Sequence, residues 1–206
     1  MTLTIEIPQP CLIVLVGAAG SGKSTFAARH FASDEVLASD GFRARLARDE
    51  ADQTANRRVF GALHAALERR LAAGRTTVVD ATNVGSAARR ALIARARAAG
   101  TPAIAIVLDL PLADCLAGDR ARADRHVPPA VIERQWTHLR AALDGRPRPG
   151  RSGASQGPSQ THPLTREGFA AVHLLTSRAA VDAVTVRRRP GRWPTLGAAP
   201  PAGSSS

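Results

Sequence analysis

The sequence contains few cysteines, few aromatic residues and no hydrophobic run long enough to cross a membrane. Its 206 residues include two cysteines, two tryptophans, five phenylalanines and no tyrosine. Both cysteines lie in apolar segments, which argues against a disulfide scaffold or a cysteine-based zinc site and makes a reducing cytoplasm the expected location. The longest clear apolar run, residues 11–16, is strand length and falls short of the ~18 residues that a membrane helix needs. No secretory signal is expected either.

Positive charge is abundant and is carried almost entirely by arginine. The chain has 28 basic and 17 acidic residues, a net charge of +11, and its single lysine is Lys23. A basic protein attracts polyanions such as nucleic acids. The same charge also follows from a biased composition with no functional meaning, so charge alone leaves both interpretations open. The hydrophobic fraction of 44% is enough for a packed core.

Short apolar runs alternate with helical patterns along the chain. Strands are expected at residues 11–16, 35–39, 76–80, 103–108 and 170–175, with a further short one at 183–186. Helices are expected from the phosphate-loop region to about residue 31 and at 53–73, 86–99, 112–122 and 129–143. This alternation predicts βαβ crossovers, an α/β fold and a mainly parallel five-stranded sheet flanked by helices.

The organisation expected from composition is one domain and a tail. Residues 1–187 form the domain, interrupted at 145–163 by a mobile insertion rich in Gly, Pro, Ser and Arg. Residues 188–206 are basic and rich in Pro and Ser, which predicts a disordered tail.

A phosphate-binding loop follows the first predicted strand. The pattern G-x-x-x-x-G-K-[ST] occupies Gly17 to Ser24, between a buried strand and a helix, which is the Walker A context. Its backbone N–H groups and the helix N-terminus attract phosphate. Lys23 is expected to contact the β- and γ-phosphates of ATP, and the Ser24 hydroxyl to bind Mg²⁺. The predicted nucleotide-binding loop is Gly17, Ala18, Ala19, Gly20, Ser21, Gly22, Lys23, Ser24 and Thr25.

Asp40 and Arg43 follow the second predicted strand, at the sheet edge where ligands of parallel sheets bind. A carboxylate near the γ-phosphate can orient an attacking hydroxyl and accept its proton. An arginine three residues later can hold an anionic acceptor. The alternative is a helix N-cap at Asp40 beside a surface arginine.

Two later segments add candidate residues. Asp80 ends the third predicted strand and is a candidate Mg²⁺ contact through water, while Asn83 is equally suited to cap the next helix. Several arginines between Arg120 and Arg125 predict a lid that closes over the γ-phosphate, although a solvated charge run explains them as well.

Taken in order, these segments resemble the 5′-kinase module of bacterial polynucleotide kinase-phosphatases, a P-loop phosphotransferase with an AAA-type ATP-binding domain. The resemblance covers roughly residues 10–187 and rests on the phosphate loop, Asp40-x-x-Arg43, residues 49–53, the Asp80 to Asn83 segment, the Arg120 to Gln135 segment and residues 166–174. It implies a P-loop kinase fold with a helical arginine lid.

The resemblance also implies roles. The module transfers the γ-phosphate of ATP, with Mg²⁺, to a 5′-OH end of RNA or DNA. By resemblance Lys23, Asp40 and Arg122 are catalytic, Asp40 being the general base. Asp40 and Arg43 bind the acceptor, and Arg122 and Arg125 bind the donor phosphates.

One departure concerns the lid. Related lids carry Arg-Asn where this sequence has Gly118-Asp119, which puts stacking on the donor base in doubt. The larger enzymes continue into phosphatase and ligase-like domains, so neither activity is expected here. Two other functions stay open: a kinase of a small metabolite or sugar nucleotide, and a non-enzymatic ATP-binding module.

Overall fold

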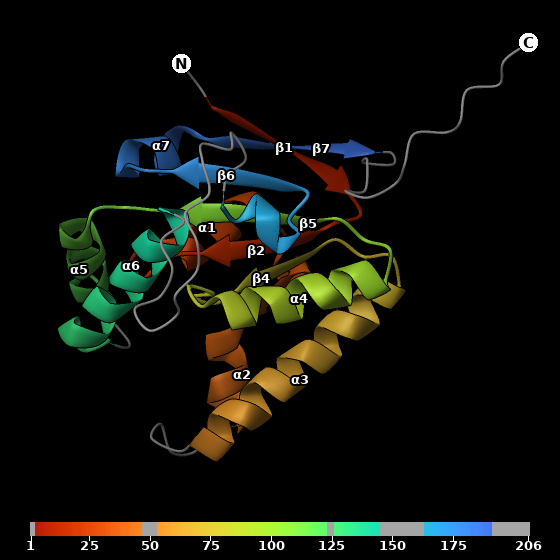
Figure 1. The fold of residues 1–206 in the computed structure, drawn as a ribbon, viewed down its shortest axis with the longest axis horizontal. Helices are drawn as coiled ribbons and strands as arrows, with labels where there is room; N and C mark the ends of the chain where they lie inside the picture. The colour runs from red at the N-terminus through yellow and green to blue at the C-terminus, as the bar shows by residue number, and fades with distance from the viewer. Residues whose placement is uncertain (1–2, 47–52, 123–125, 145–162, 191–206) are drawn as a thin grey trace, which may run out of the picture.

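The computed structural model describes residues 3–46, 53–122, 126–144 and 163–190. Figure 1 shows a central sheet with helices on both faces. The five strands lie in the order β3-β4-β2-β5-β6, and every neighbouring pair is parallel. The strands are β2 (Leu12–Val16), β3 (Val36–Ala38), β4 (Thr77–Asp80), β5 (Ala103–Leu108) and β6 (Ala171–Leu175).

Helices and short turns connect these strands. The α-helices are α1 (Lys23–His30), α2 (Ser39–Leu46), α3 (Gln53–Ala72), α4 (Ser86–Ala98), α5 (Leu112–Arg120), α6 (Pro129–Leu143) and α7 (Arg178–Ala183). Two 3₁₀ turns are η1 (Ser33–Glu35) and η2 (Thr165–Glu167). The predicted α/β class and the five-stranded parallel sheet are confirmed, with strand and helix ends shifted by one or two residues.

The sheet separates two apolar cores because successive side chains of a strand point to opposite faces. Ile13 and Leu15 of β2 pack with α1 on one face, in a cluster that includes Phe26 and Phe31. Leu12, Val14 and Val16 pack on the other face with α3 and α4. The buried α3 residues are Val59, Leu63, Leu67 and Leu71, the four-residue stripe expected of a helix on a sheet. This arrangement fixes β2, and the loop that follows it, at the centre of the molecule.

A second, two-stranded sheet joins the two ends of the described chain. The sheet itself was not predicted, and the short strand expected at 183–186 overlaps only the start of its second strand. β1 (Thr4–Gln9) runs parallel to β7 (Thr185–Pro190), with Ile5 opposite Val186 and Ile7 opposite Arg188. Ile5 and Ile7 are fully buried in the core beside α1. In Figure 1 this pair lies above the central sheet, next to β6 and α7. Segments about 180 residues apart in sequence therefore complete one core together.

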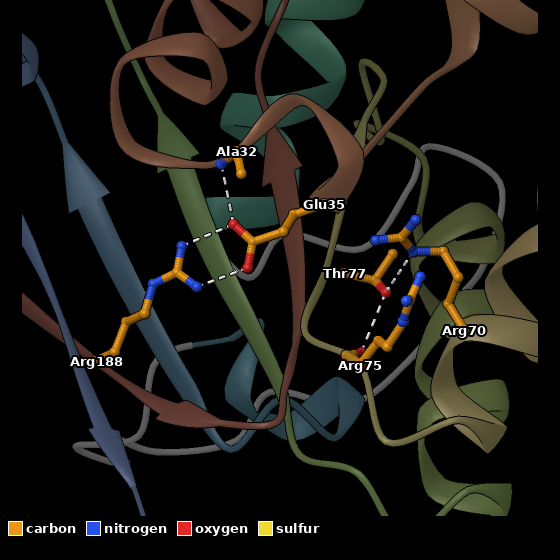
Figure 2. Close-up of polar contacts among 6 residues, drawn as sticks. All are labelled: Ala32, Glu35, Arg70, Arg75, Thr77 and Arg188. Atoms are coloured by element: carbon orange, nitrogen blue, oxygen red, sulfur yellow. Dashed lines mark hydrogen bonds and ion pairs between the residues drawn. The ribbon is translucent and has the colours of Figure 1, made fainter.

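An ion pair fastens β7 to the rest of the fold. Figure 2 shows Glu35 accepting hydrogen bonds at 2.6 and 2.7 Å from both terminal nitrogens of Arg188, and a third at 3.0 Å from the Ala32 N–H. The Arg188 guanidinium holds the pKa of Glu35 below its usual range. In the same view Arg70 of α3 donates a 3.1 Å bond to Thr77 at the start of β4.

These contacts correct the predicted tail. Residues 188–190 belong to β7 and are paired, so the boundary placed after residue 187 is wrong by three residues. The remaining tail (191–206) and the predicted insertion, apart from Pro163, lie outside the described residues. Within the described ranges, no helix is long and apolar enough to cross a membrane.

Deleting residues 187–206 is expected to destabilise the fold. Residues 6–9 of β1 lose the strand residues that pair with them, and Glu35 loses its ion pair with Arg188. The melting temperature should fall by about 5 °C or more. A chain ending at Pro190 keeps all of β7 and is the control. Equal melting temperatures of the two truncated chains, measured by calorimetry, would contradict this expectation.

Candidate active site

The phosphate loop joins β2 to α1 and lines a cavity of about 570 Å³. In Figure 1 the β2 arrow points toward α5 and α6, so the loop lies at the carboxyl edge of the sheet, as predicted. Gly20 and Gly22 have φ of 75° and 92°, a left-handed backbone that glycine adopts without strain. The cavity wall includes Ala19, Gly20, Gly22, Lys23, Ser24 and Thr25.

Lys23 is held inside this loop by the loop's own backbone. Its Nζ donates to the carbonyl oxygens of Gly17 at 3.0 Å and Ala18 at 2.8 Å, and lies 3.4 Å from the Ser21 hydroxyl. The residue is 7% exposed. The predicted loop residues Gly17, Ala18 and Ser21 thus position the lysine, while the other members of the loop face the cavity.

Burial makes Lys23 a weak base in the free protein. Loss of hydration lowers its pKa from 10.5 to about 8, while the nearby Asp80 carboxylate acts in the opposite direction. A bound phosphate stabilises the ammonium form and raises this pKa again. Ligand binding and protonation of Lys23 are therefore coupled.

This coupling predicts pH-dependent nucleotide binding. Above pH 8 the lysine is mostly neutral in the free protein and must take up a proton when phosphate binds. The Kd for ATP should then rise roughly tenfold per pH unit above 8. Calorimetry in buffers of different ionisation enthalpy measures the proton uptake. The two cysteines should not contribute to this pH dependence, because burial raises the pKa of both thiols, that of Cys11 to about 12. A constant Kd between pH 7.5 and 9.5 would contradict the assignment.

The loop after β4 forms the floor of the cavity. Asp80 is 7% exposed and lines the cavity with Ala81 and Thr82. Asn83 does not cap the following helix, whose N-cap is Gly85. Instead its side-chain amide donates a 2.8 Å bond to the carbonyl oxygen of Leu15 in β2, from a backbone with φ of 48°.

A second contact holds this segment against the phosphate loop, since the Gly17 N–H donates to the Thr82 carbonyl oxygen at 3.0 Å. From the far side, the fully buried Arg89 donates to the carbonyl oxygens of Asn83 and Val84 at 2.9 and 2.7 Å. Glu167 of η2 binds the same guanidinium at 2.6 and 2.7 Å. Arg89 therefore keeps the strand end rigid.

Helix α2 supplies one wall. Asp40 and Arg43 both line the cavity that Lys23 lines, so the structure brings the three predicted residues to one space. Asp40 is not an N-cap, because α2 already begins at Ser39. It lies in the first turn, where the helix dipole favours a carboxylate, and it is exposed to solvent.

The segment predicted as a lid supplies the opposite wall. Arg122 lines the cavity, and so do Val127 and Val131. Arg125 lies outside the described residues. The buried Asp119 accepts a 3.0 Å hydrogen bond from the Val127 N–H and so closes the base of the segment.

Close packing explains why position 118 is a glycine. A Cβ atom on Gly118 would collide with the carbonyl oxygen of Gly20 in the phosphate loop. Helix α5 therefore packs directly on that loop, and an arginine side chain does not fit at this position.

Sequence reasoning did not single out three further residues that line the cavity: Phe60, Gln135 and Arg178. Gln135 of α6 accepts a 2.8 Å hydrogen bond from the Ala19 N–H. A terminal nitrogen of Arg178 lies 2.9 Å from where a Cβ of Gly22 would be, and another lies 3.2 Å from that of Gly118. Arg178 thus adds a cation beside the loop, from a helix outside the predicted elements.

The oxygen donors in the cavity suit Mg²⁺. The Ser24 hydroxyl at the start of α1 and the Asp80 carboxylate at the end of β4 both line it, and hard oxygen ligands are what this ion prefers. Among the described residues, no group of three or more His, Cys, Asp or Glu side chains could hold a metal.

A phosphate loop after the central strand of a parallel sheet, with a buried lysine inside it, is the arrangement of P-loop nucleotide-binding proteins. The family described as "AAA domain" matches residues 12–145, and the chain belongs to this family. The chain therefore has the fold of P-loop kinases, and its family supports ATP binding. No functionally curated protein matches the sequence.

Solved structures share the fold. A chain of the Pnkp1/Rnl/Hen1 RNA repair complex superposes with a TM-score of 0.58 at 22% identity, over 73% of this chain and 53% of that one. This chain thus spans about half of that protein's length. An AvrRxo1-ORF1:-ORF2 complex with ATP gives a TM-score of 0.51 at 19% identity, covering 65% and 48%.

A sugar kinase from a Janibacter species gives a TM-score of 0.50 at 16% identity, over 81% of this chain and 85% of that one. Structures this distant from the present chain in sequence show that they share its fold.

Proposed function

We propose that this protein is an ATP-dependent polynucleotide 5′-hydroxyl kinase that transfers the γ-phosphate to a 5′-OH end of RNA or DNA. The observation that carries the proposal is the shared cavity of Asp40 and Arg43 with Lys23 and Arg122. One wall offers a carboxylate and a cation to an acceptor, and the facing elements offer two cations to a triphosphate. The net charge of +11 favours a polyanionic substrate.

In the proposed reaction the 5′-oxygen bonds to the γ-phosphorus while the bond from that phosphorus to the β,γ-bridging oxygen breaks. The hydroxyl proton passes to Asp40, and ADP leaves. Lys23 and Arg122 stabilise the charge on the transferring phosphoryl group. Mg²⁺, held by Ser24 and through water by Asp80, would neutralise charge on the β- and γ-phosphates.

The direct test is transfer of labelled γ-phosphate to a 5′-OH oligonucleotide, beside a panel of sugars and nucleosides. The proposal predicts a kcat/KM for the oligonucleotide well above that for any small acceptor. Preferred use of a sugar or another small metabolite would overturn it. Binding of ATP without transfer to any acceptor would instead indicate a non-enzymatic module.

Arg43 should decide between acceptors with and without a neighbouring phosphate. The wild-type protein is expected to prefer a 5′-OH nucleoside 3′-phosphate over the plain nucleoside. Arg43→Ala should remove most of that preference, a loss of roughly 10- to 100-fold for a charge-assisted contact.

The matched control is Arg45→Ala. Arg45 lies on the same helix, donates to the Gly41 carbonyl oxygen at 3.0 Å and stacks over Phe42, away from the cavity lining. Equal use of both acceptors by the wild-type protein would favour a small-metabolite kinase.

A further inference from the structure

Phe60 does not belong to the buried stripe of its helix, α3. The apolar stripe of α3, from Val59 to Leu71, is at most 3% exposed, whereas Phe60 is 37% exposed. Leu3 is the other large hydrophobic residue classed as exposed among the described residues. Single exposed hydrophobic residues are ordinary on protein surfaces, so the position of Phe60 matters more than its exposure.

That position is the wall of the cavity that also contains Asp40 and Arg43. Helix α2 packs along α3, which places the ring and the two acceptor residues on the same side of the site. The His64 ring lies 6.4 Å from the Phe60 ring, one turn further along the helix. Phe60 therefore has an aromatic neighbour on its own helix and contributes to the cavity wall.

We propose that Phe60 is the stacking surface for the terminal nucleobase of the acceptor, an inference that rests on the proposed function. A flat aromatic ring binds any nucleobase through its face. The same wall offers a cation for a phosphate and a carboxylate for a hydroxyl. A nucleotide end carries all three groups within one residue, whereas a small sugar offers no planar ring.

This assignment also accounts for selectivity toward ends. With aromatic residues at 3% of the sequence, the chain has few surfaces on which a long single strand could stack. One ring beside the reacting hydroxyl recognises the terminal base and leaves the following bases unread. Acceptor choice then depends little on base identity, and the one expected effect is a small preference for purines because their stacking area is larger.

The test compares three variants on two acceptors. Phe60→Ala removes the ring, Phe60→Tyr keeps it, and Leu3→Ala removes an exposed apolar side chain far from the cavity lining. The acceptors are matched 5′-OH oligonucleotides with a base or an abasic site at the 5′ end. Phe60→Ala should lower kcat/KM about tenfold for the first acceptor. It should leave the abasic acceptor unchanged, whereas the other two variants should behave like wild type.

A binding readout separates stacking from catalysis. A 5′-terminal 2-aminopurine should lose fluorescence when it binds the wild-type protein and Phe60→Tyr, and keep it with Phe60→Ala. Equal losses of activity on both acceptors, or unchanged quenching with Phe60→Ala, would overturn the inference while leaving the kinase assignment intact. Failure of the wild-type protein to phosphorylate either oligonucleotide would overturn the proposed function, and this inference with it.

Discussion

Replacing Lys23 with alanine is expected to abolish phosphoryl transfer almost completely. The ammonium group is enclosed by the carbonyl oxygens of Gly17 and Ala18 and points into the loop where phosphate binds. No other lysine exists to replace it, and the residue is only 7% exposed, so its charge is weakly screened. Single-turnover transfer should fall by about 10³-fold or more.

The control is Arg90→Ala, which removes one positive charge from the exposed face of α4 and leaves the cavity unchanged. Lys23→Arg should also fail, because a guanidinium is larger than the buried space that the ammonium occupies. Transfer by Lys23→Ala at close to the wild-type rate would disprove the role of the phosphate loop.

Replacing Asp40 with asparagine is expected to separate nucleotide binding from transfer. The substitution preserves the size of the side chain and removes its charge. Phosphoryl transfer is largely dissociative, so the carboxylate chiefly aligns the hydroxyl and accepts its proton late. Transfer should fall by roughly 10²-fold or more. The Kd for ATP should stay the same or decrease slightly, because a carboxylate near the γ-phosphate repels it.

Asp34→Asn is the matched control, since Asp34 is an exposed carboxylate in η1 outside the cavity lining. Nucleotide titration and single-turnover transfer to a 5′-OH oligonucleotide measure both effects. If Asp40→Asn transfers within about threefold of wild type, Asp40 is structural and Asp80, in the same cavity, becomes the candidate base.

The central sheet could be predicted because each of its strands is marked locally. The apolar runs of β2 and β5 are continuous, and glycines end the helices before β4 and β5 at residues 74 and 100. β1 lacks such marks, and only the first two residues of β7 fall within the short strand expected at 183–186. β7 contains three successive arginines, a composition typical of a disordered tail, and two of them are neutralised by Glu35 and Glu6, far away in sequence.

In the site, too, residues marked by a sequence motif could be predicted and residues brought in by tertiary packing could not. The residues of the predicted phosphate loop form one contiguous motif, and the spacing of Asp40 and Arg43 after a strand was enough to place them in the cavity. Arg178 and Phe60 occur in segments without a motif, and only tertiary packing brings them to the site. Capping of the next helix was one of the roles considered for Asn83, because its side chain is short and polar, and nothing nearby in sequence indicates its bond to Leu15.

The pairing of β1 with β7 has a consequence for synthesis on the ribosome. At 5 to 20 residues per second, β7 emerges roughly 10 to 40 s after β1. Throughout that interval Ile5 and Ile7, fully buried in the finished protein, have no strand beside them. The nascent chain therefore exposes the unpaired edge of β1 until β7 has been synthesised. Slowing elongation downstream of residue 144 prolongs this exposure and increases the demand for chaperones.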